Sequence, residues 1–127
     1  MNYLENQNDC VRVYGDDHLK VDFERGMVLL DSKEMKLTRK ERELFLLLVA
    51  NTGEIIPRNV LLFSVWGYCN EIRTRTLDLH IRRLRKKLGQ YGERYIETIF
   101  GVGYCFQRFR ELRTLSQFVP LFAPVAA

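Results

Sequence analysis

The chain has 127 residues, enough for one domain with a hydrophobic core and too few for a second domain of ordinary size. Hydrophobic residues make up 46% of the sequence, which favours a folded protein over a disordered one. The formal net charge is only +4, and the distribution of that charge along the chain is more informative than its size.

We expect neither a secretory signal nor a membrane-spanning segment in this sequence. The first residues lack the basic start and apolar run of a signal peptide. The longest apolar stretch, 118–127, contains two prolines and is about half as long as a spanning helix of ~20 residues. Cys10, Cys69 and Cys105 lie far apart and there are two histidines, so neither a disulfide framework nor a zinc site is predicted. We expect a cytoplasmic protein with no cofactor, no bound metal and no membrane partner.

Residues 11–37 alternate short apolar runs with turn-forming clusters, reading VRVY, GDD, LKVDF, ERG, MVLL, DSKE and MKL. Short strands separated by Gly, Asp and Ser are typical of a small antiparallel meander. His18 falls in one of the turns and has no discernible role. We expect residues 1–9 to be a flexible N-terminus, 10–108 the folded domain and 109–127 a tail of uncertain structure.

Two helices are predicted after these strands. Thr38 and Glu41 form a capping box that satisfies free amides at a helix start, and Asn-Thr-Gly at 51–53 ends that helix. A short extended link, 55–56, leads to Pro57, which suits the first turn of a second helix. The inward-facing residues expected on this second helix are Leu61, Leu62, Val65 and Trp66.

Residues 73–88 read RTRTLDLHIRRLRKKL and predict a third helix with one apolar and one cationic face. At about 100° per residue, the apolar stripe consists of Leu77, Ile81, Leu84 and Leu88. Roughly opposite lie Arg75, Leu79, Arg82, Arg83 and Lys86. The segment holds seven of the 20 Lys and Arg residues and one of the 16 acidic residues, so its formal charge of +6 exceeds that of the whole chain. Such focused charge indicates a polyanionic partner.

After Gly89 the apolar pattern changes to period two. Residues 95–99 and 104–106 are plausible strands, and the glycines of the joining segment 100–103 allow the positive φ of a hairpin turn. The GVG of this segment lies between strands rather than before a helix, so it is not a nucleotide-binding fingerprint. The sequence also lacks a nucleophile with its base and clustered carboxylates, and we expect no enzyme.

Strands, three helices with a basic third one, and a hairpin define a winged helix. At LTRKERELFLLL, VWGY, TRTLDLHIRRLRKKLG and IETIFGVGYCF the chain resembles the DNA-binding effector domain of the OmpR/PhoB family of bacterial response regulators, in the family's order and spacing. The resemblance covers residues 11–108. It implies an α+β winged helix-turn-helix with an N-terminal four-stranded antiparallel sheet, a three-helix bundle and a C-terminal β-hairpin wing.

The resemblance implies a sequence-specific regulator of transcription that binds double-stranded DNA. Residues 73–88 are then the recognition helix in the major groove, and the wing, about 99–104, lies at the minor groove. A receiver domain would need about a hundred more residues, so the protein is either an effector domain or a lone regulator without a receiver. The alternative is a non-specific nucleic-acid-binding or protein-interaction module that uses the same basic helix.

The expected contacts to DNA begin with the cationic face of the recognition helix. The helical wheel points Arg75, Arg82, Arg83 and Lys86 at DNA, with Arg85 and Lys87 flanking them near phosphates, and Leu79 near a thymine methyl. The resemblance adds Thr76 and His80 as backbone contacts, although His80 also suits a packed position at the border of the apolar stripe. The full set expected on this helix is Arg73, Arg75, Thr76, Leu79, His80, Arg82, Arg83, Arg85, Lys86 and Lys87.

The wing departs from its relatives, which commonly carry an arginine before the first wing glycine and often a cation after the tyrosine. Here those positions are Phe100 and Cys105, so a charged minor-groove anchor is in doubt. Phe100 suits the deoxyribose wall, a neighbouring protomer or its own core. The wing residues expected at DNA are Thr98, Phe100, Gly101, Gly103 and Tyr104, of which Thr98 suits a phosphate and the last three keep the hairpin's shape.

The resemblance also implies protein partners. The loop between the second and third helices is expected to contact bacterial RNA polymerase through Tyr68, Asn70 and Glu71. Two protomers are expected to bind direct repeats head to tail, about one helical turn apart.

The +6 segment predicts that binding to duplex DNA weakens steeply with salt. If four to six phosphates are neutralised per protomer, a plot of log K against log salt concentration has a slope of roughly −4 to −5. Titrations of a labelled duplex at several salt concentrations measure this slope. A slope near zero would contradict the electrostatic interpretation.

Overall fold

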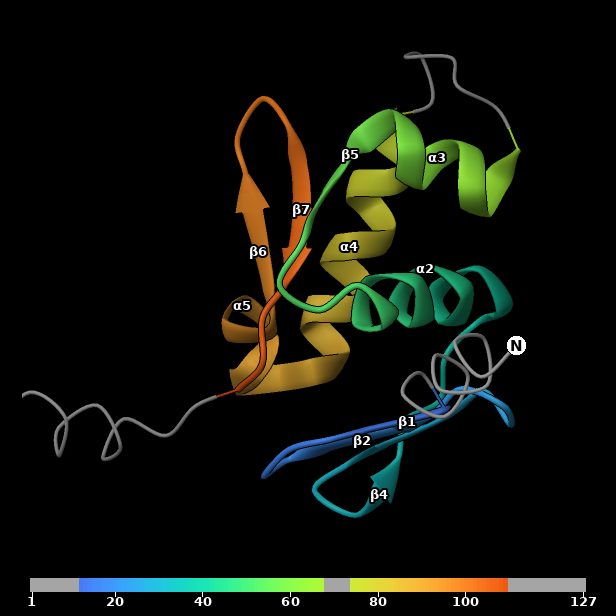
Figure 1. The fold of residues 1–127 in the computed structure, drawn as a ribbon, viewed down its shortest axis with the longest axis vertical. Coiled ribbons are helices and arrows are strands. Elements are labelled where there is room, and N and C mark those ends of the chain that lie inside the picture. The colour runs from blue at the N-terminus through green and yellow to red at the C-terminus, as the bar shows by residue number, and fades with distance from the viewer. Residues whose placement is uncertain (1–11, 68–73, 110–127) are drawn as a thin grey trace, which may run out of the picture.

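The computed structural model describes residues 12–67 and 74–109. An N-terminal sheet comes first along the chain, then helices α2, α3 and α4, and then a hairpin, which forms a second sheet with a strand from between α2 and α3 (Figure 1). Residues 1–9, expected to be flexible, and 110–127 of the expected tail lie outside the described residues.

The N-terminal sheet has four antiparallel strands in sequential order, as the family resemblance implies. They are β1 (Val13–Gly15), β2 (Leu19–Asp22), β3 (Met27–Leu30) and β4 (Lys33–Glu34). Alternate residues of β2 are buried, Leu19 at 0% and Val21 at 1% exposure, because successive side chains of a strand point to opposite faces. This sheet therefore presents one apolar face to the helices.

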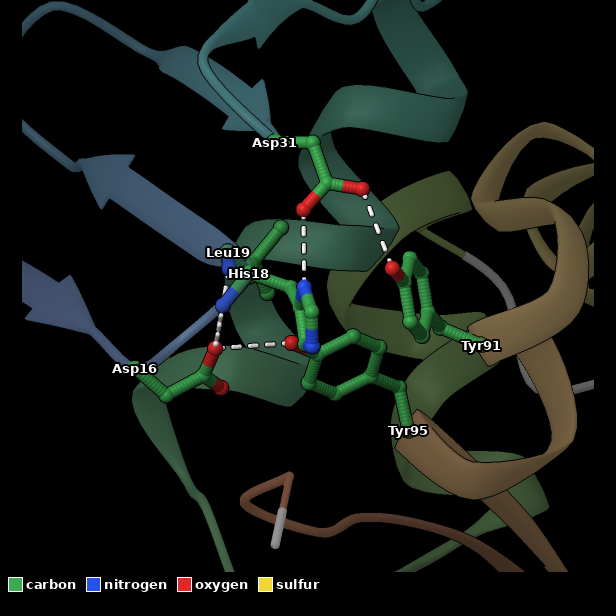
Figure 2. A network of polar contacts seen from close by, with 6 residues as sticks. All are labelled: Asp16, His18, Leu19, Asp31, Tyr91 and Tyr95. Carbon is green, nitrogen blue, oxygen red and sulfur yellow. Dashed lines mark hydrogen bonds and ion pairs between the residues drawn. The ribbon is translucent and has the colours of Figure 1, made fainter. Parts of the chain in front are cut away.

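A tight two-residue turn joins β3 to β4, where Leu30 pairs with Lys33. Asp31 and Ser32 have φ of 50° and 71°, as a type I′ turn requires. Neither residue is glycine, but the Asp31 carboxylate accepts hydrogen bonds from the His18 ring (2.7 Å) and the Tyr91 hydroxyl (3.1 Å) (Figure 2). These bonds help to hold the turn in its uncommon conformation.

His18, to which the sequence assigned no role, is part of a polar network between the N-terminal sheet and the segment that follows α4 (Figure 2). Its ring stacks on Tyr91 with centroids 4.4 Å apart. Beside it, Asp16 Oδ1 accepts from the Tyr95 hydroxyl (2.8 Å) and from the amides of His18 and Leu19. Burial opposes ionisation of Asp16, but these hydrogen bonds and one from Tyr14 outweigh it and hold the pKa of Asp16 below its ordinary value.

Helix α2 (Arg39–Ala50) begins at the predicted capping box. The Glu41 amide donates to the Thr38 hydroxyl (3.2 Å), and the Thr38 amide donates to the Glu41 carboxylate (3.0 Å). Helix α3 (Arg58–Trp66) has Pro57 at its N-cap, and Gly67 ends it with φ of 82°. Leu61, Leu62 and Val65 are buried in the core, and Trp66 packs against it partly buried, on the expected face.

Helix α4 (Thr74–Leu88) is the predicted basic helix. A short helical segment follows it, consisting of η2 (Gly89–Tyr91) and α5 (Gly92–Tyr95). Tyr95 therefore ends a helical turn and does not begin the strand predicted over 95–99. Its ring is fully buried and stacks on Phe106 with centroids 5.3 Å apart, so packing in the core decides its conformation.

The hairpin consists of β6 (Ile96–Ile99) and β7 (Gly103–Phe106), and it has a third strand. The extended link expected at 55–56 is strand β5 (Ile55–Pro57), which pairs with β7 so that the order is β5-β7-β6. Ile56 has 7% exposure, so its side chain is buried where the backbones of β5 and β7 pair. This strand ties the start of α3 to the hairpin (Figure 1).

Gly103 is required for the close approach of β5 and β7. A Cβ at this position would stand 2.9 Å from the Ile56 carbonyl carbon and from Pro57 Cα. Among the wing glycines, Gly101 has φ of +78°, but Gly103 is not among the residues with positive φ. The expectation that both glycines serve the turn through positive φ is therefore wrong for Gly103, which serves packing.

We predict that Gly103→Ala lowers the free energy of unfolding by about 1–3 kcal/mol, because the added methyl forces two paired backbones apart. Gly15→Ala is the matched control, since Gly15 is also a strand residue but has no atom within 4 Å of a Cβ built there. Urea unfolding followed by circular dichroism measures both variants. Equal midpoints for the two would show that the β5–β7 contact does not constrain residue 103.

Candidate nucleic-acid interface

Helix α4 has the two faces that its sequence predicts. Leu77, Ile81, Leu84 and Leu88 are at most 1% exposed, and they face the core. On the other face, the exposed residues are Arg75, Leu79, Arg82, Arg83 and Lys86. Among the described residues, the four cations of this face take part in no hydrogen bond or ion pair. Their charge is therefore available to a partner.

One flank of α4 contacts the hairpin and the start of α3 through the single acid of the helix. The Asp78 carboxylate accepts from Arg58 Nη2 at 2.6 Å to each oxygen and from the Tyr104 hydroxyl at 2.6 Å. The hydrogen bond from Arg58 to Asp78 raises the pKa of Arg58, which keeps its positive charge. Tyr104, expected among the wing residues at DNA, has 5% exposure and directs its hydroxyl to Asp78.

Arg85, about two turns further along α4, contacts the other strand of the hairpin. Its Nη2 donates to the Ile96 carbonyl (2.6 Å) and to the Thr98 hydroxyl (2.7 Å). Its guanidinium also lies 5.9 Å from the centre of the Tyr104 ring. Arg85 and Thr98 were both expected at phosphates, and in the described structure they bind each other. Together with Asp78, Arg85 fixes the hairpin beside α4.

The opposite flank of α4 contacts α2 through Lys87. Its ammonium donates to Glu41 Oε1 (2.6 Å) and to the Lys36 carbonyl (2.9 Å). Burial disfavours the Glu41 carboxylate, but the Lys87 and Thr38 hydrogen bonds lower its pKa by more. Glu41 has 1% exposure, so removal of Lys87 would leave a buried charge without its cation.

His80 lies on this same flank, at the border of the apolar stripe. Its Nδ1 lies 2.8 Å from the Thr76 carbonyl, which only accepts, so Nδ1 carries a proton. The ring packs edge-on against Trp66 with centroids 4.9 Å apart. A hydrogen bond from Nε2 to a phosphate therefore requires the imidazolium form. Packing and phosphate contact, the two expectations for His80, are thus compatible.

An open cleft of about 940 Å³ is lined by residues of α4, of the segment that follows it and of β7. Its lining includes four cations, namely Arg82, Arg85, Lys86 and Arg94, and two acids, Asp78 and Glu93. Tyr104 also lines it, so the cleft joins the exposed face of α4 to the hairpin. A cleft lined by more cations than acids suits the sugar-phosphate backbone of a nucleic acid.

The wing tip is exposed and carries no charge. Phe100 has 90% exposure and Val102 has 45%, so Phe100 does not pack in the core of its own chain. Cys105, which stands where relatives often carry a cation, has 1% exposure, and burial raises the pKa of its thiol. No contact to a partner is therefore available from position 105.

Four of the expected contact residues lie outside the described residues, namely Arg73, Tyr68, Asn70 and Glu71. Sequence reasoning missed Arg58, whose position just after Pro57 gives no sign of a partner in α4. It counted Asp78 only as the single acid of a basic segment and did not predict its ion pair with Arg58. Arg94 was missed as well, because the sequence placed it outside the recognition helix.

Neither a metal-binding cluster nor a membrane-spanning helix is present among the described residues. No group of three or more His, Cys, Asp or Glu side chains among them is arranged to hold a metal ion. No helix in the same ranges has the length and apolar character needed to cross a membrane.

Comparison with known proteins identifies relatives over most of the chain. Residues 32–106 match the family described as "Transcriptional regulatory protein, C terminal". Response regulator ArlR of Staphylococcus haemolyticus is 36% identical over 102 residues, which are 80% of this chain and 45% of ArlR. The chain thus spans about half the length of the curated relatives it matches.

Solved structures share the fold. Response regulator DrrB of Thermotoga maritima, an OmpR/PhoB homologue, is 35% identical with a TM-score of 0.69, over 76% of this chain and 45% of DrrB. The DNA-binding domain of Klebsiella pneumoniae RstA, solved in complex with the RstA box, is 26% identical with a TM-score of 0.68. That match covers 76% of this chain and 97% of the RstA domain.

Replacement of Asp78 by Asn is expected to have two opposite effects on binding to DNA. Asp78→Asn removes the one negative charge of the basic helix α4, which by itself strengthens binding to a polyanion. It also weakens the bonds to Arg58 and Tyr104 that place the hairpin. We predict that the second effect wins, with unfolding free energy lower by about 1 kcal/mol and weaker binding to duplex DNA.

Glu93→Gln is the matched control, because Glu93 is exposed and lines the same cleft. This variant should bind duplex DNA as tightly as the parent chain or slightly more tightly. Fluorescence anisotropy at one salt concentration compares the two. Tighter binding by both variants would show that Asp78 acts only through its charge.

Proposed function

Because this chain belongs to the OmpR/PhoB family of DNA-binding C-terminal domains of transcriptional regulators, we propose that it recognises specific duplex sites through α4 and thereby regulates transcription. In this proposal α4 enters the major groove and the hairpin lies at the adjacent minor groove. The single observation that supports it most is the exposed face of α4, where Arg75, Arg82, Arg83 and Lys86 have no partner among the described residues.

The positions of these cations support different roles for them in binding DNA. Arg82 and Lys86 line the cleft toward the hairpin, where a phosphate strand would pass. Arg83 is exposed but is not among the residues that line the cleft. We therefore assign Arg83 to a base edge, where a guanidinium binds guanine bidentately, and Lys86 to phosphate, which a point charge neutralises.

The remaining residues expected at DNA have different roles in this proposal. Arg75, Leu79 and Arg73 belong to the DNA-facing side of the helix, and Thr76 and His80 to the backbone contacts. Arg85, Thr98 and Lys87 reach phosphate only in addition to, or in exchange for, their bonds within the protein. Gly101, Gly103 and Tyr104 act by shaping the hairpin.

The proposed protein partners rest on family membership. They are bacterial RNA polymerase, contacted through Tyr68, Asn70 and Glu71, and a second protomer bound head to tail on direct repeats. Since bacterial chromosomal DNA lies in the cytoplasm, we propose that the protein acts there. We propose no enzymatic activity.

Selection of duplexes from a random pool tests the function directly. We expect one enriched half-site, or two in tandem about one helical turn apart. Equal recovery of all sequences despite tight binding would favour the non-specific nucleic-acid-binding alternative. The absence of any duplex binding would favour a protein-interaction module.

Arg83→Ala tests base readout on the selected site. We expect its affinity for that site to fall by about 1–3 kcal/mol, and its affinity for scrambled duplex to fall much less. Lys86→Ala is the control and should weaken both about equally, with a salt slope shallower by roughly one unit. If both variants lose the same factor on both duplexes, α4 does not read sequence through Arg83.

A further inference from the structure

The chain beyond β7 folds back onto the N-terminal sheet. Arg108 Nη1 donates to the Gly15 carbonyl (2.8 Å), and the Arg108 guanidinium lies 4.9 Å from the centre of the Tyr14 ring. Phe109, which the sequence placed in the tail, has only 7% exposure. All of these residues lie outside the range 32–106 that matches the family. The match to the family therefore does not account for this join between the two ends of the domain.

Phe109 belongs to an aromatic cluster between the N-terminal sheet and the segment that follows α4. Its ring meets the His18 ring edge-on with centroids 4.6 Å apart, and its centroid lies 5.4 Å from that of Tyr91 and 5.7 Å from that of Tyr95. The Arg94 guanidinium lies 4.2 Å from the centre of the Phe109 ring. Contacts of rings with rings and with cations depend on orientation. Phe109 therefore constrains the positions of its neighbours as well as filling space.

The two tyrosines of this cluster are also bound to the sheet. The Tyr95 and Tyr91 hydroxyls donate to two carboxylates in turns of the N-terminal sheet, at 2.8 Å and 3.1 Å (Figure 2). From the other side, the Gln107 amide donates to the Tyr95 carbonyl (2.7 Å), and Phe109 contacts both rings. We call residues 107–109 the C-terminal clasp, because they help to hold η2 and α5 against the sheet.

The segment held by the clasp contacts the backbone of α4 directly. A Cβ at Gly92, the first residue of α5, would stand 2.9 Å from the Cα of Arg85. The Arg85 guanidinium in turn donates to the Ile96 carbonyl (2.6 Å) and the Thr98 hydroxyl (2.7 Å) of β6. Because the two backbones touch at Gly92, a displacement of α5 also displaces Arg85 and the hairpin bound to it.

The exposed cations of α4 lie beside this contact. Arg82 is three residues before Arg85 in the helix, and Lys86 is the residue after it. Figure 1 shows the end of β7 beside α5, at the opposite end of the hairpin from its tip. The clasp therefore acts on the C-terminal half of α4 without itself lying on the exposed face of that helix.

We propose that Arg108 and Phe109 are positioning residues for sequence recognition, which hold the C-terminal half of α4 and the hairpin in the arrangement that a specific duplex requires. This inference rests on the proposed function. Neither side chain has to touch DNA, since Phe109 is buried and Arg108 is bound to the sheet. Base contacts need exact placement, whereas phosphate contacts to any sequence tolerate displacement, so loss of the clasp lowers the ratio of specific to non-specific affinity.

Phe109→Ala in the full chain removes the aromatic contacts of the clasp. We expect affinity for the selected duplex to fall about tenfold, affinity for scrambled duplex to change by less than about twofold, and the salt slope to stay the same. Phe23→Ala is the matched control, because Phe23 also packs partly buried against the core but lies between β2 and β3. This control should lower the melting temperature and keep the parent's specificity ratio.

Arg108→Ala tests the clasp through an exposed side chain, and it decides the question if Phe109→Ala fails to fold. We expect the specificity ratio to fall about threefold, because the contacts of Phe109 remain. Arg12→Ala is the matched control, since it removes the same charge from another exposed arginine at the N-terminal sheet, and it should keep the ratio. Equal weakening of both duplexes by Arg108→Ala, with a salt slope shallower by roughly one unit, would assign Arg108 to phosphate and overturn its positioning role.

Amide hydrogen exchange distinguishes positioning from general stability. Phe109→Ala should speed exchange in residues 82–95 and leave α2 as protected as in the parent chain. Equal acceleration throughout the chain, or an equal loss of specificity for Phe23→Ala, would overturn the proposal, because either result assigns Phe109 to general stability. A parent chain that enriches no half-site would remove the proposed function and the role of the clasp with it. A folded Phe109→Ala or Arg108→Ala chain with the parent's specificity ratio would remove only the clasp.

Discussion

The burial of one stripe of α4 is the constraint on which the interface depends. Leu77, Ile81, Leu84 and Leu88 are together almost fully buried, and each contributes about 1.5–3 kcal/mol of hydrophobic stabilisation. A helix that commits this stripe to the core has no freedom to rotate about its axis. The residues half a turn away, Arg82 and Lys86 among them, are therefore forced into solvent as one continuous cationic face.

The two flanks of the same helix attach neighbouring elements to α4. Asp78 and Arg85 bind the hairpin and α3 on one flank, while Lys87 binds Glu41 of α2 on the other. Cations of α4 thus divide into those that hold the protein together and those that face outward. A count of basic residues in the sequence overstates how many are available to DNA, because it cannot distinguish these two groups.

The hairpin is likewise attached to the helices at several points. Strand β5 pairs with β7, Gly103 allows the two backbones to approach, and the Arg58 amide holds the loop from the α3 side. The wing is consequently an extension of the helix bundle and not a separate appendage. Because its base is fixed at several points, an exposed side chain at its tip has a defined position relative to α4.

The far end of α4 is held in turn by the polar network around Asp16 and Asp31 (Figure 2). Tyr95 and Tyr91, which follow the helix, donate to these two carboxylates of the N-terminal sheet. Phe109 is 7% exposed and packs against Tyr91 and Tyr95, so the packed part of the domain includes this residue. The N-terminal sheet therefore helps to orient α4, although the sheet lies away from the exposed face of that helix.

The sequence by itself determined the features that depend on residues close together along the chain. The capping box at Thr38 and Glu41, the two faces of α4 and the glycine turn at Gly101 are local patterns, and each is present as predicted. The order of the elements followed from the same local patterns, and the number of strands in the N-terminal sheet followed from the family resemblance. Tertiary structure decided what depends on distant residues, namely the pairing of β5 with β7, the helical conformation of Tyr95 and the partners of Asp78, Arg85 and Lys87. These contacts join residues up to 51 positions apart, and periodicity carries no information about which side chain stands across a packed interface.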